Sequence, residues 1–404
     1  MPESIRQLKS ETEKAEVLRG PFDPGGQPDL SGDHPLHLSL FAWNVRSGLS
    51  ATKAVLSDPA RLRDFWEWPS ASKLLQSAEA AGFDSQLQYG MWSGYGGDIG
   101  WNDAALDFAT APAAAAAVTS RLGLLTTFHV GYGVHPLWLA KITSATDHVA
   151  GGRLGVNIIA STNANDYAQF GIGDKPTREQ KYEVADEFTT LLKYLWTSDH
   201  PIDFEGKYFQ AYGAQVNPRP ASSPRPLLMS AAQSDIGFDY AARQCDLMFI
   251  ASNVTGGSLD EYRTKAEKIH AAAGQYGRKV RVCAMCYVVM EETDAEAEKK
   301  VRWMAEEIDR EALRNHIIRT GLGPEADLED RYLGLGKDRY TQFGLGMHGY
   351  QLFGSYDTVA DKLAGLYEAG VGQVALCFFD PHRGVEQMRD HLLPRLRERG
   401  LRND

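Results

Sequence analysis

One amide interrupts an apolar run near the middle of the chain. The stretch GGRLGVNIIAST (151–162) has the character of a buried strand, yet Asn157 stands inside it. Burying an amide costs free energy unless its polar atoms find hydrogen-bond partners. Asn157 therefore either bonds a neighbouring strand or faces a ligand. The pattern of residues alone favours the first interpretation, because buried polar groups generally have partners.

Further polar residues stand where other apolar runs end. They are Trp43, Asn44, Tyr89, Thr126, Thr127, His129 and Ser161. In a parallel barrel the carboxyl ends of all strands meet at one mouth, so these side chains are expected to face a common site. His129 is a candidate general acid or base, since its unperturbed pKa is near neutral. A hydrogen-bonded core histidine is the alternative, and His135 and His148 are interpreted as structural.

A second candidate site lies where a strand passes directly into a helix. The segment SAAQSDIG (230–237) contains small residues whose backbone N–H groups an anion can approach closely. A helix N-terminus of this kind is a natural phosphate site. Simple capping of the helix by Ser234 explains the same residues equally well.

The elements that position these residues alternate regularly along the chain. Helical periodicity is clearest after Pro69, where Ala71, Leu74, Leu75 and Ala78 share one face before Gly82. Other helices are expected near 104–119, 136–149, 178–196, 234–243, 258–274 and 293–311, and from Ser355. Eight strands are expected, at 37–43, 83–89, 122–128, 153–160, 226–231, 245–251, 280–290 and 373–379. This alternation predicts an α/β fold, a (β/α)8 TIM barrel with insertions.

The chain divides into an arm and one large domain. Residues 1–35 are charged and rich in Gly and Pro, and are expected to be flexible or ordered only against a partner subunit. Residues 36–404 form a single barrel domain. It carries an inserted hairpin near 202–217, where apolar and polar residues alternate, and a lid-like glycine-rich insertion near 312–353.

Composition and missing motifs exclude several classes of protein. A net charge of −11 argues against nucleic-acid binding, and no apolar run is long enough to span a membrane. Four cysteines are too few for a disulfide scaffold, so a cytoplasmic protein is expected. Cys283 and Cys286 would point to opposite faces of one strand. There is no GxGxxG, HExxH, GxSxG or paired Cys/His spacing, so neither a doubly wound nucleotide fold nor a metal site is expected.

Several motifs together resemble one enzyme family. GGRLGVNIIAST, DYAQFGI, SAAQSDIGFDYAARQCDLMF, SGYGG and GSYDTVADKL are similar to segments of the bacterial-luciferase-like flavin-dependent monooxygenases. The resemblance is nearest to the pyrimidine oxygenase and dimethyl-sulfone monooxygenase branch. It implies a homodimer or homotetramer that takes reduced FMN from a separate NAD(P)H:flavin reductase and uses O2. A small organic substrate would be oxidised through a flavin peroxide, with a C–S, C–N or carbon–halogen bond as a candidate for cleavage.

The resemblance also assigns roles to individual residues. It implies catalytic roles for Asn157 and Thr127 at the flavin N5 edge, and His129 joins them as a candidate. The implied cofactor-binding residues are Thr127, Asn157, Ser161, Tyr167, Ser230, Ala232, Gln233 and Ser234. An F420-dependent oxidoreductase on the same barrel and a non-enzymatic flavin-binding protein remain alternatives.

The expected substrate pocket departs from the pyrimidine oxygenase pattern. Met91 replaces a lysine and Thr162 replaces a tryptophan of that branch. The remaining residues expected to line the mouth are Trp43, Tyr89, Trp92 and Tyr95, with Trp138 as a further candidate. Such a lining predicts an apolar or aromatic small substrate.

Overall fold

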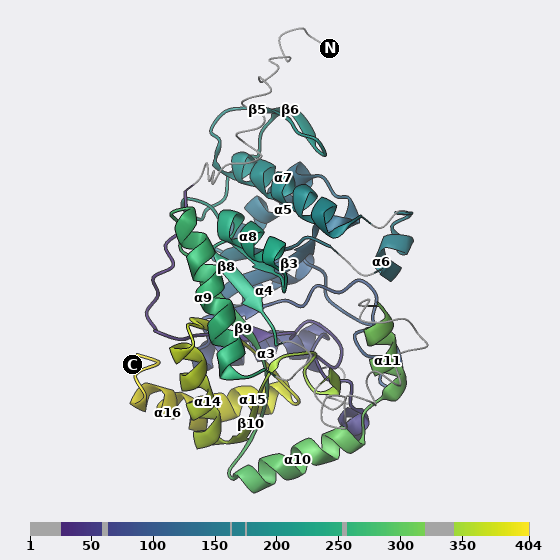
Figure 1. The fold of residues 1–404 in the computed structure, drawn as a ribbon, viewed down its shortest axis with the longest axis vertical. Coiled ribbons are helices and arrows are strands. Elements are labelled where there is room, and N and C mark those ends of the chain that lie inside the picture. Colours follow the sequence, from purple (N-terminus) through teal and green to yellow (C-terminus); the bar gives the residue numbers. More distant parts are fainter. Residues whose placement is uncertain are drawn as a thin grey trace.

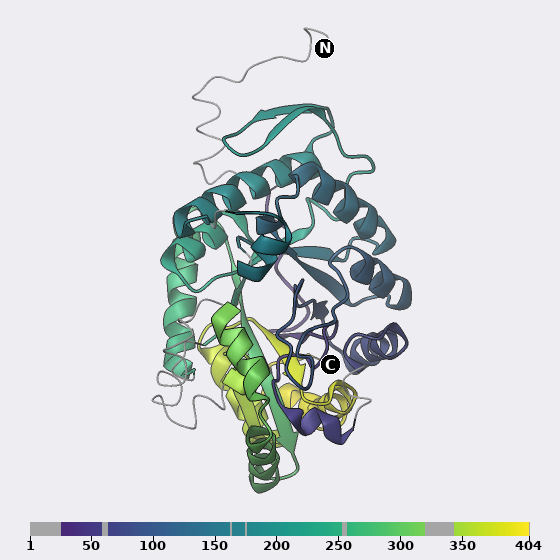
Figure 2. The ribbon, with the colours of Figure 1, turned by 90° about the vertical axis from the view of Figure 1, so that its right-hand side faces the viewer.

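The architecture is a closed parallel barrel. The computed structural model describes residues 26–58, 64–161, 164–173, 176–252, 257–319 and 343–403 of the chain. Eight parallel strands pair in a ring in which β1 lies between β2 and β11, and Figure 2 shows helices surrounding it. In ring order the strands are β1 (His37–Phe41), β2 (Ser85–Leu87), β3 (Gly123–His129), β4 (Leu154–Ile159), β7 (Leu227–Ala231), β8 (Leu247–Ile250), β9 (Arg281–Glu291) and β11 (Gln373–Phe378). The predicted TIM barrel is confirmed.

Helices cover the outside of the ring (Figure 1). The helix α3 (Trp68–Ala81) begins with a proline in its first turn and ends at Gly82, whose φ of 93° is left-handed. Its predicted apolar face is buried. The others are α4 (Thr110–Val118), α5 (Pro136–Val149), α7 (Arg178–Thr197), α8 (Asp235–Gln244), α9 (Leu259–Gln275), α14 (Tyr356–Glu368), α15 (Pro381–Gln387) and α16 (Leu393–Glu398).

Alternation along the strands divides the apolar core into two layers. Leu38 and Leu40 of β1 belong to the outer layer, between the strands and the helices, whereas Phe41 belongs to the inner layer inside the ring. Cys283 lies in the inner layer and Cys286 in the outer one, as their spacing on a strand predicts. The faces of the strands therefore decide which side chains can reach the mouth.

A ninth parallel strand extends the sheet outside the ring. The strand β10 (Tyr350–Ser355) pairs with the second half of the long strand β9, from Cys286 to Glu291. The sequence did not predict this strand, which falls at the end of the expected lid-like insertion. Residues 320–342 of that insertion lie outside the described part of the chain.

The helix expected at 293–311 is confirmed in its first part, but it ends earlier than expected and a second helix follows. These are α10 (Asp294–Glu306) and α11 (Arg310–Arg319), and Asp309 immediately precedes the second. The Asp309 carboxylate accepts hydrogen bonds from the backbone N–H groups of Ala312 and Ile99. It therefore caps the new helix and ties it to the loop after β2.

Two short segments flank the barrel. An antiparallel hairpin of β5 (Ile202–Glu205) and β6 (Gln210–Ala214) lies outside α5 and α7 (Figures 1 and 2). Residues 1–25 of the arm lie outside the described residues. From residue 26 the chain lies against its own barrel, where Gln27 bonds the backbone of Lys279 and Leu30 accepts from Arg281.

The carboxyl end of the barrel carries two further helices. The helices α6 (Ala164–Gln169) and α11 lie at the same end, on the right in Figure 1 and toward the viewer in Figure 2. A membrane span would need a longer and more apolar helix than any in the described segments.

Candidate active site

The two central residues of the expected site are neighbours inside the ring. Thr127 of β3 and Asn157 of β4 are paired in register, and both are almost completely buried. Asn157 Nδ2 donates to Thr127 Oγ1 at 3.1 Å, and Thr127 Oγ1 donates to the carbonyl of Gln88 at 2.6 Å. A hydroxyl has one hydrogen, so Thr127 can only accept from Asn157. This direction turns the amide so that its oxygen is the free end.

The free amide oxygen is the most informative atom of the site. Asn157 Oδ1 is buried and has no hydrogen-bond partner among the described residues. A buried acceptor without a donor costs free energy, so such atoms usually meet a ligand or water. The NH2 group of Asn157 thus bonds the neighbouring strand, while its oxygen is available to a ligand. Both interpretations that the sequence left open are therefore compatible with the structure.

His129 lies one inward position beyond Thr127. Its Nδ1 is 2.7 Å from the carbonyl oxygen of Ser161, and its Nε2 is 3.3 Å from that of Gly90. Burial lowers the pKa of His129, and the hydrogen bond to Ser161 opposes that shift. The ring is therefore neutral near pH 7 and carries one N–H, which makes the shorter contact.

A glycine keeps this wall of the mouth compact. A Cβ on Gly90 would lie 2.5 Å from Thr127 Cγ2 and 2.8 Å from His129 Nε2. Because real side chains do not approach so closely, a larger residue would push both groups out of position. The absence of a side chain at Gly90 thus helps to fix Thr127 and His129.

The start of α8 provides a second, separate polar region. Ser234 stands at the N-cap position but makes no capping hydrogen bond; its side chain faces Tyr182, where it opposes the rise in pKa that burial causes. A Cβ on Gly237 would lie 2.4 Å from the Tyr182 hydroxyl, so glycine permits this approach. The first-turn N–H groups of α8 are left without a side-chain cap, which suits an anion. Sequence reasoning missed Tyr182.

The neighbouring residues of this segment differ in what they can offer. Ser230 is fully buried and donates to the carbonyl of Ile158 at 3.0 Å, so its hydroxyl is used within the sheet. Gln233 Oε1 accepts from Lys265 Nζ at 2.9 Å, and the same ammonium donates to the Ala251 carbonyl at 2.6 Å. Lys265 thus turns the amide of Gln233 so that its NH2 is the free end.

The expected cofactor residues of the next segment lie around α6. Tyr167 is 4% exposed, and a Cβ on Gly131 would lie 2.9 Å from its hydroxyl. Beside it the carboxylate of Asp166 is buried and accepts from Ser93 Oγ at 2.5 Å. Its charge raises the pKa values of Tyr89 and Tyr95, in both cases after the larger effect of burial. Asp166 belongs to the quoted motif DYAQFGI, which was the available signal for it.

The aromatic residues expected around the substrate occupy three different places. Tyr89 and Met91 pack on the inner layer, and the Tyr89 ring lies 5.9 Å from that of Phe41. Tyr95 is buried against Trp101 and His316, whereas Trp92 is 53% exposed and contacts Tyr132 and Phe170. The structure brings these four to the carboxyl end of the barrel.

Other expected lining residues lie elsewhere. Trp43 is fully buried in the outer layer and donates to Gln86 Oε1 at 2.5 Å, so it stands apart from the mouth. Trp138 is 48% exposed on α5 and packs against Phe108. Thr162 lies outside the described residues.

Comparison with known proteins identifies the family. The model of the luciferase-like monooxygenase family matches residues 45–373. The chain belongs to this family. The expectation of a flavin-dependent monooxygenase is therefore confirmed at the level of the family. The pyrimidine monooxygenase RutA of Acinetobacter baylyi is 29% identical over 330 residues, which cover 81% of this chain and 87% of RutA.

Solved structures share the fold. Riboflavin lyase RcaE, determined with modified FMN and riboflavin, superposes with a TM-score of 0.79 at 23% identity, covering 91% of this chain and 92% of RcaE. DmoA from Hyphomicrobium sulfonivorans also gives 0.79, at 21% identity over 92% of this chain and 90% of DmoA. At these identities the likeness establishes the barrel, and the chemistry must be argued from the site itself.

Proposed function

We propose that this protein is an FMNH2- and O2-dependent, two-component monooxygenase that oxidises a small organic molecule. The observation that carries the proposal is the free, buried oxygen of Asn157, fixed at the mouth by Thr127 and Gln88. Reduced flavin has an N–H at N5, which is the donor that this acceptor lacks. Bound FMN would supply the electrons for oxygen activation.

The α8 region supports a phosphate-bearing cofactor. Its uncapped N–H groups, the Ser234 hydroxyl and the free NH2 of Gln233 are all donors, as a phosphate requires. Ala232 is small and buried beside them. Tyr182, which lies beside Ser234, would help to position that hydroxyl. Ser230, Ser161 and Tyr167 would contribute through the position of the backbone and packing.

The polar residues of the mouth would protect and orient the reactants. Thr127 and Asn157 carry no readily lost proton, so they can orient the cofactor through the Asn157 oxygen without protonating a reactive intermediate. The neutral ring of His129 would stay beside them as a hydrogen-bonding group. Buried apolar side chains such as Phe41 would limit the entry of water.

The proposal includes partners and a class of substrate. A separate NAD(P)H:flavin reductase would supply reduced FMN, and the enzyme would act as a homodimer or homotetramer. RutA acts on pyrimidines, but Met91 stands where that branch has a lysine. We therefore favour a less polar substrate that loses a C–S, C–N or carbon–halogen bond.

The test measures product formation with a flavin reductase, NADH, FMN and O2. The panel contains uracil, dimethyl sulfone, EDTA, hexadecane and riboflavin. Replacing Asn157 by Ala should leave the Kd for FMN within about threefold and lower the product formed per FMNH2 oxidised about fivefold, since one hydrogen bond contributes about 1 kcal/mol. The exposed amide of Asn217 provides the matched control, N217A, which should behave as wild type.

Three outcomes would contradict the proposal. Unchanged product per FMNH2 in N157A would remove the role of Asn157. Tight binding of F420 without binding of FMN would instead indicate a hydride-transferring oxidoreductase. FMN binding without product from the whole panel would indicate a flavin-binding protein.

A further inference from the structure

A strained turn lies between the end of the insertion and β10. Met347 and His348 have φ values of 47° and 73°, and Gly349 N–H donates to the Gly346 carbonyl at 2.7 Å. Both central residues of this tight turn are thus left-handed, a conformation usual for glycine and asparagine. Residues with bulkier side chains pay a conformational cost there, and such strain persists where surrounding contacts enforce it.

Contacts with two strands enforce the turn at the mouth. The His348 carbonyl accepts from both N and Oγ of Ser252, at 2.8 and 2.7 Å, and Ser252 follows the end of β8. A Cβ on Gly349 would lie 3.3 Å from the backbone nitrogen of Tyr287, so the turn lies directly on β9. It occupies the place where β8 stops pairing with β9 and β10 begins.

The side chain of His348 has no polar partner. Its ring packs edge-on against Phe343, with centroids 3.9 Å apart, and it forms no hydrogen bond to any residue in the described ranges. His129, in contrast, has both ring nitrogens near carbonyl oxygens. Burial, with a smaller effect from the charge of Lys265, lowers the pKa of His348 to about 4. The ring is therefore neutral at pH 7 and offers one donor and one acceptor.

The position of His348 complements the polar wall already described. Thr127 and Asn157 belong to β3 and β4, whereas the turn lies at β8 and β9, farther round the ring. Between them, inside the ring, Phe41 packs on Phe249 at 5.2 Å and on Tyr89 at 5.9 Å. The turn that carries His348 thus lies across an apolar base from the polar wall of Thr127 and Asn157.

We propose that His348 binds the substrate, with its imidazole hydrogen-bonded to an uncharged polar group, such as a carbonyl, amide or sulfonyl oxygen, on an otherwise apolar molecule. This inference rests on the proposed monooxygenase function. It explains why a histidine stands in a turn where glycine would be relaxed, and why its ring makes no hydrogen bond to the described residues.

The experiment separates substrate binding from folding and from cofactor binding. Wild type, H348G and H348N are compared on whichever compound of the panel (uracil, dimethyl sulfone, EDTA, hexadecane or riboflavin) the wild type turns over fastest. Glycine relieves the backbone while removing the ring, so H348G should unfold at a temperature no lower than wild type. Its Kd for FMN should stay within twofold, and its KM for the substrate should rise about tenfold with a smaller change in kcat. M347L, which keeps the strained turn and its apolar packing, is the matched control and should behave as wild type.

Two results overturn the inference, and they are distinguishable. A wild-type KM in folded H348G would show that the ring does not meet the substrate. If H348G is destabilised, H348N takes its place, since asparagine tolerates the left-handed conformation, and the same criterion applies. If the wild type turns over none of the panel, the proposed function fails and this inference fails with it. If the wild type is active and the His348 variants have the same KM as the wild type, this inference alone fails.

Discussion

The two ends of the barrel treat buried polar groups in opposite ways. At the amino end, Arg225, Asp246 and Arg278 precede β7, β8 and β9 and are buried, with Asp246 2.7 Å from Arg225 and 3.1 Å from Arg278. Asp246 also accepts from the backbone N–H of Leu228. At the carboxyl end, the buried oxygen of Asn157 has no hydrogen-bond partner among the described residues.

This difference separates residues that stabilise the fold from residues that wait for a ligand. A buried charge is tolerated when it is paired and hydrogen-bonded, and the carboxylate of Asp246 meets that condition. A buried polar atom without a partner lowers stability, and at the mouth of a barrel it is a candidate for binding a ligand. The position of the free Asn157 oxygen agrees with the position of active sites in TIM barrels.

The largest expected effect is at the amino end. Replacing Asp246 by Asn should lower the free energy of unfolding by about 3–5 kcal/mol, because two buried guanidinium groups lose their counter-charge. Urea denaturation measures the loss. The product formed per FMNH2 oxidised by the folded fraction should remain that of wild type. A lower value in the folded D246N protein would contradict the division between the two ends.

The mouth should be the acid-sensitive end. Burial lowers the pKa of His316 to about 3 and that of His348 to about 4, from an ordinary value of 6.5. The folded state therefore resists protonation of both rings. Their contribution to the free energy of unfolding is fully present above pH 6.5 and is lost as the pH falls toward 4 for His348 and 3 for His316. The free energy of unfolding should therefore fall by about 2 kcal/mol less in H348N than in wild type when the pH is lowered from 7 to 4.5. Parallel urea curves at both pH values test this, and an unchanged difference would refute it.

Adjacent threonines allow the same comparison within one strand. Thr126 faces the outer layer and its hydroxyl lies 2.6 Å from Gln88 Oε1, whereas Thr127 faces the interior. Each change to Val should cost about 1 kcal/mol of stability, since each removes one buried hydrogen-bonding group. T127V alone should lower product per FMNH2, by about tenfold. An equal yield of product per FMNH2 in T126V and T127V would show that the inward face of the strand has no special role.

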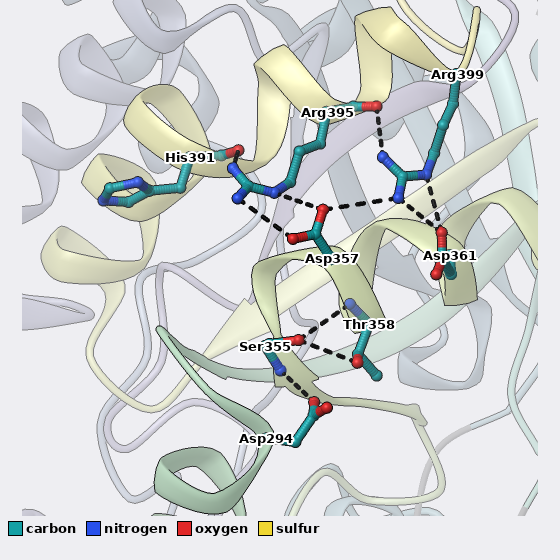
Figure 3. Close-up of polar contacts among 8 residues, drawn as sticks. All are labelled: Asp294, Ser355, Asp357, Thr358, Asp361, His391, Arg395 and Arg399. Carbon is teal, nitrogen blue, oxygen red and sulfur yellow. Dashed lines mark hydrogen bonds and ion pairs between the residues drawn. The ribbon is translucent and has the colours of Figure 1, made fainter.

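The smallest effect is expected on the surface. Arg399 pairs with Asp361 at 2.7 Å and Arg395 with Asp357 at 2.8 Å, between α16 and α14 (Figure 3). Exposed pairs gain little, so R399A should change the free energy of unfolding by about 0.5 kcal/mol or less. The same urea assay in low and high salt measures it. A loss comparable to that of D246N would mean that burial does not decide the value of these pairs.

Local patterns were enough to predict the barrel. Eight apolar runs of strand length, separated by helical periodicity, specify repeated β/α units, because each unit must bury one face of its helix on the sheet. Period-two alternation also placed Cys283 and Cys286 on opposite faces. The same patterns missed β10, since Gly346, Gly349 and Gly354 make its surroundings read as a loop.

Features that depend on distant backbone atoms could not be predicted. Simple alternation from Phe41 would turn Trp43 toward the interior, but Ala42 has a φ of 57° and Trp43 joins the outer layer. The orientation of the Asn157 amide likewise depends on the carbonyl of Gln88, which directly follows β2 and accepts the Thr127 hydrogen. Only the three-dimensional arrangement shows that Thr127 has already used its hydrogen there.

The pairing of β1 with β11 has a consequence for how the chain is made. His37, near the start, finds its partner Gln373 near the end, so the ring cannot close until nearly the whole chain has been synthesised. Until then β1 and β9 each keep an exposed edge, and such edges invite pairing with other chains. During synthesis the nascent protein is therefore expected to be an open sheet that can pair with other chains, and β11 removes both exposed edges when it closes the ring.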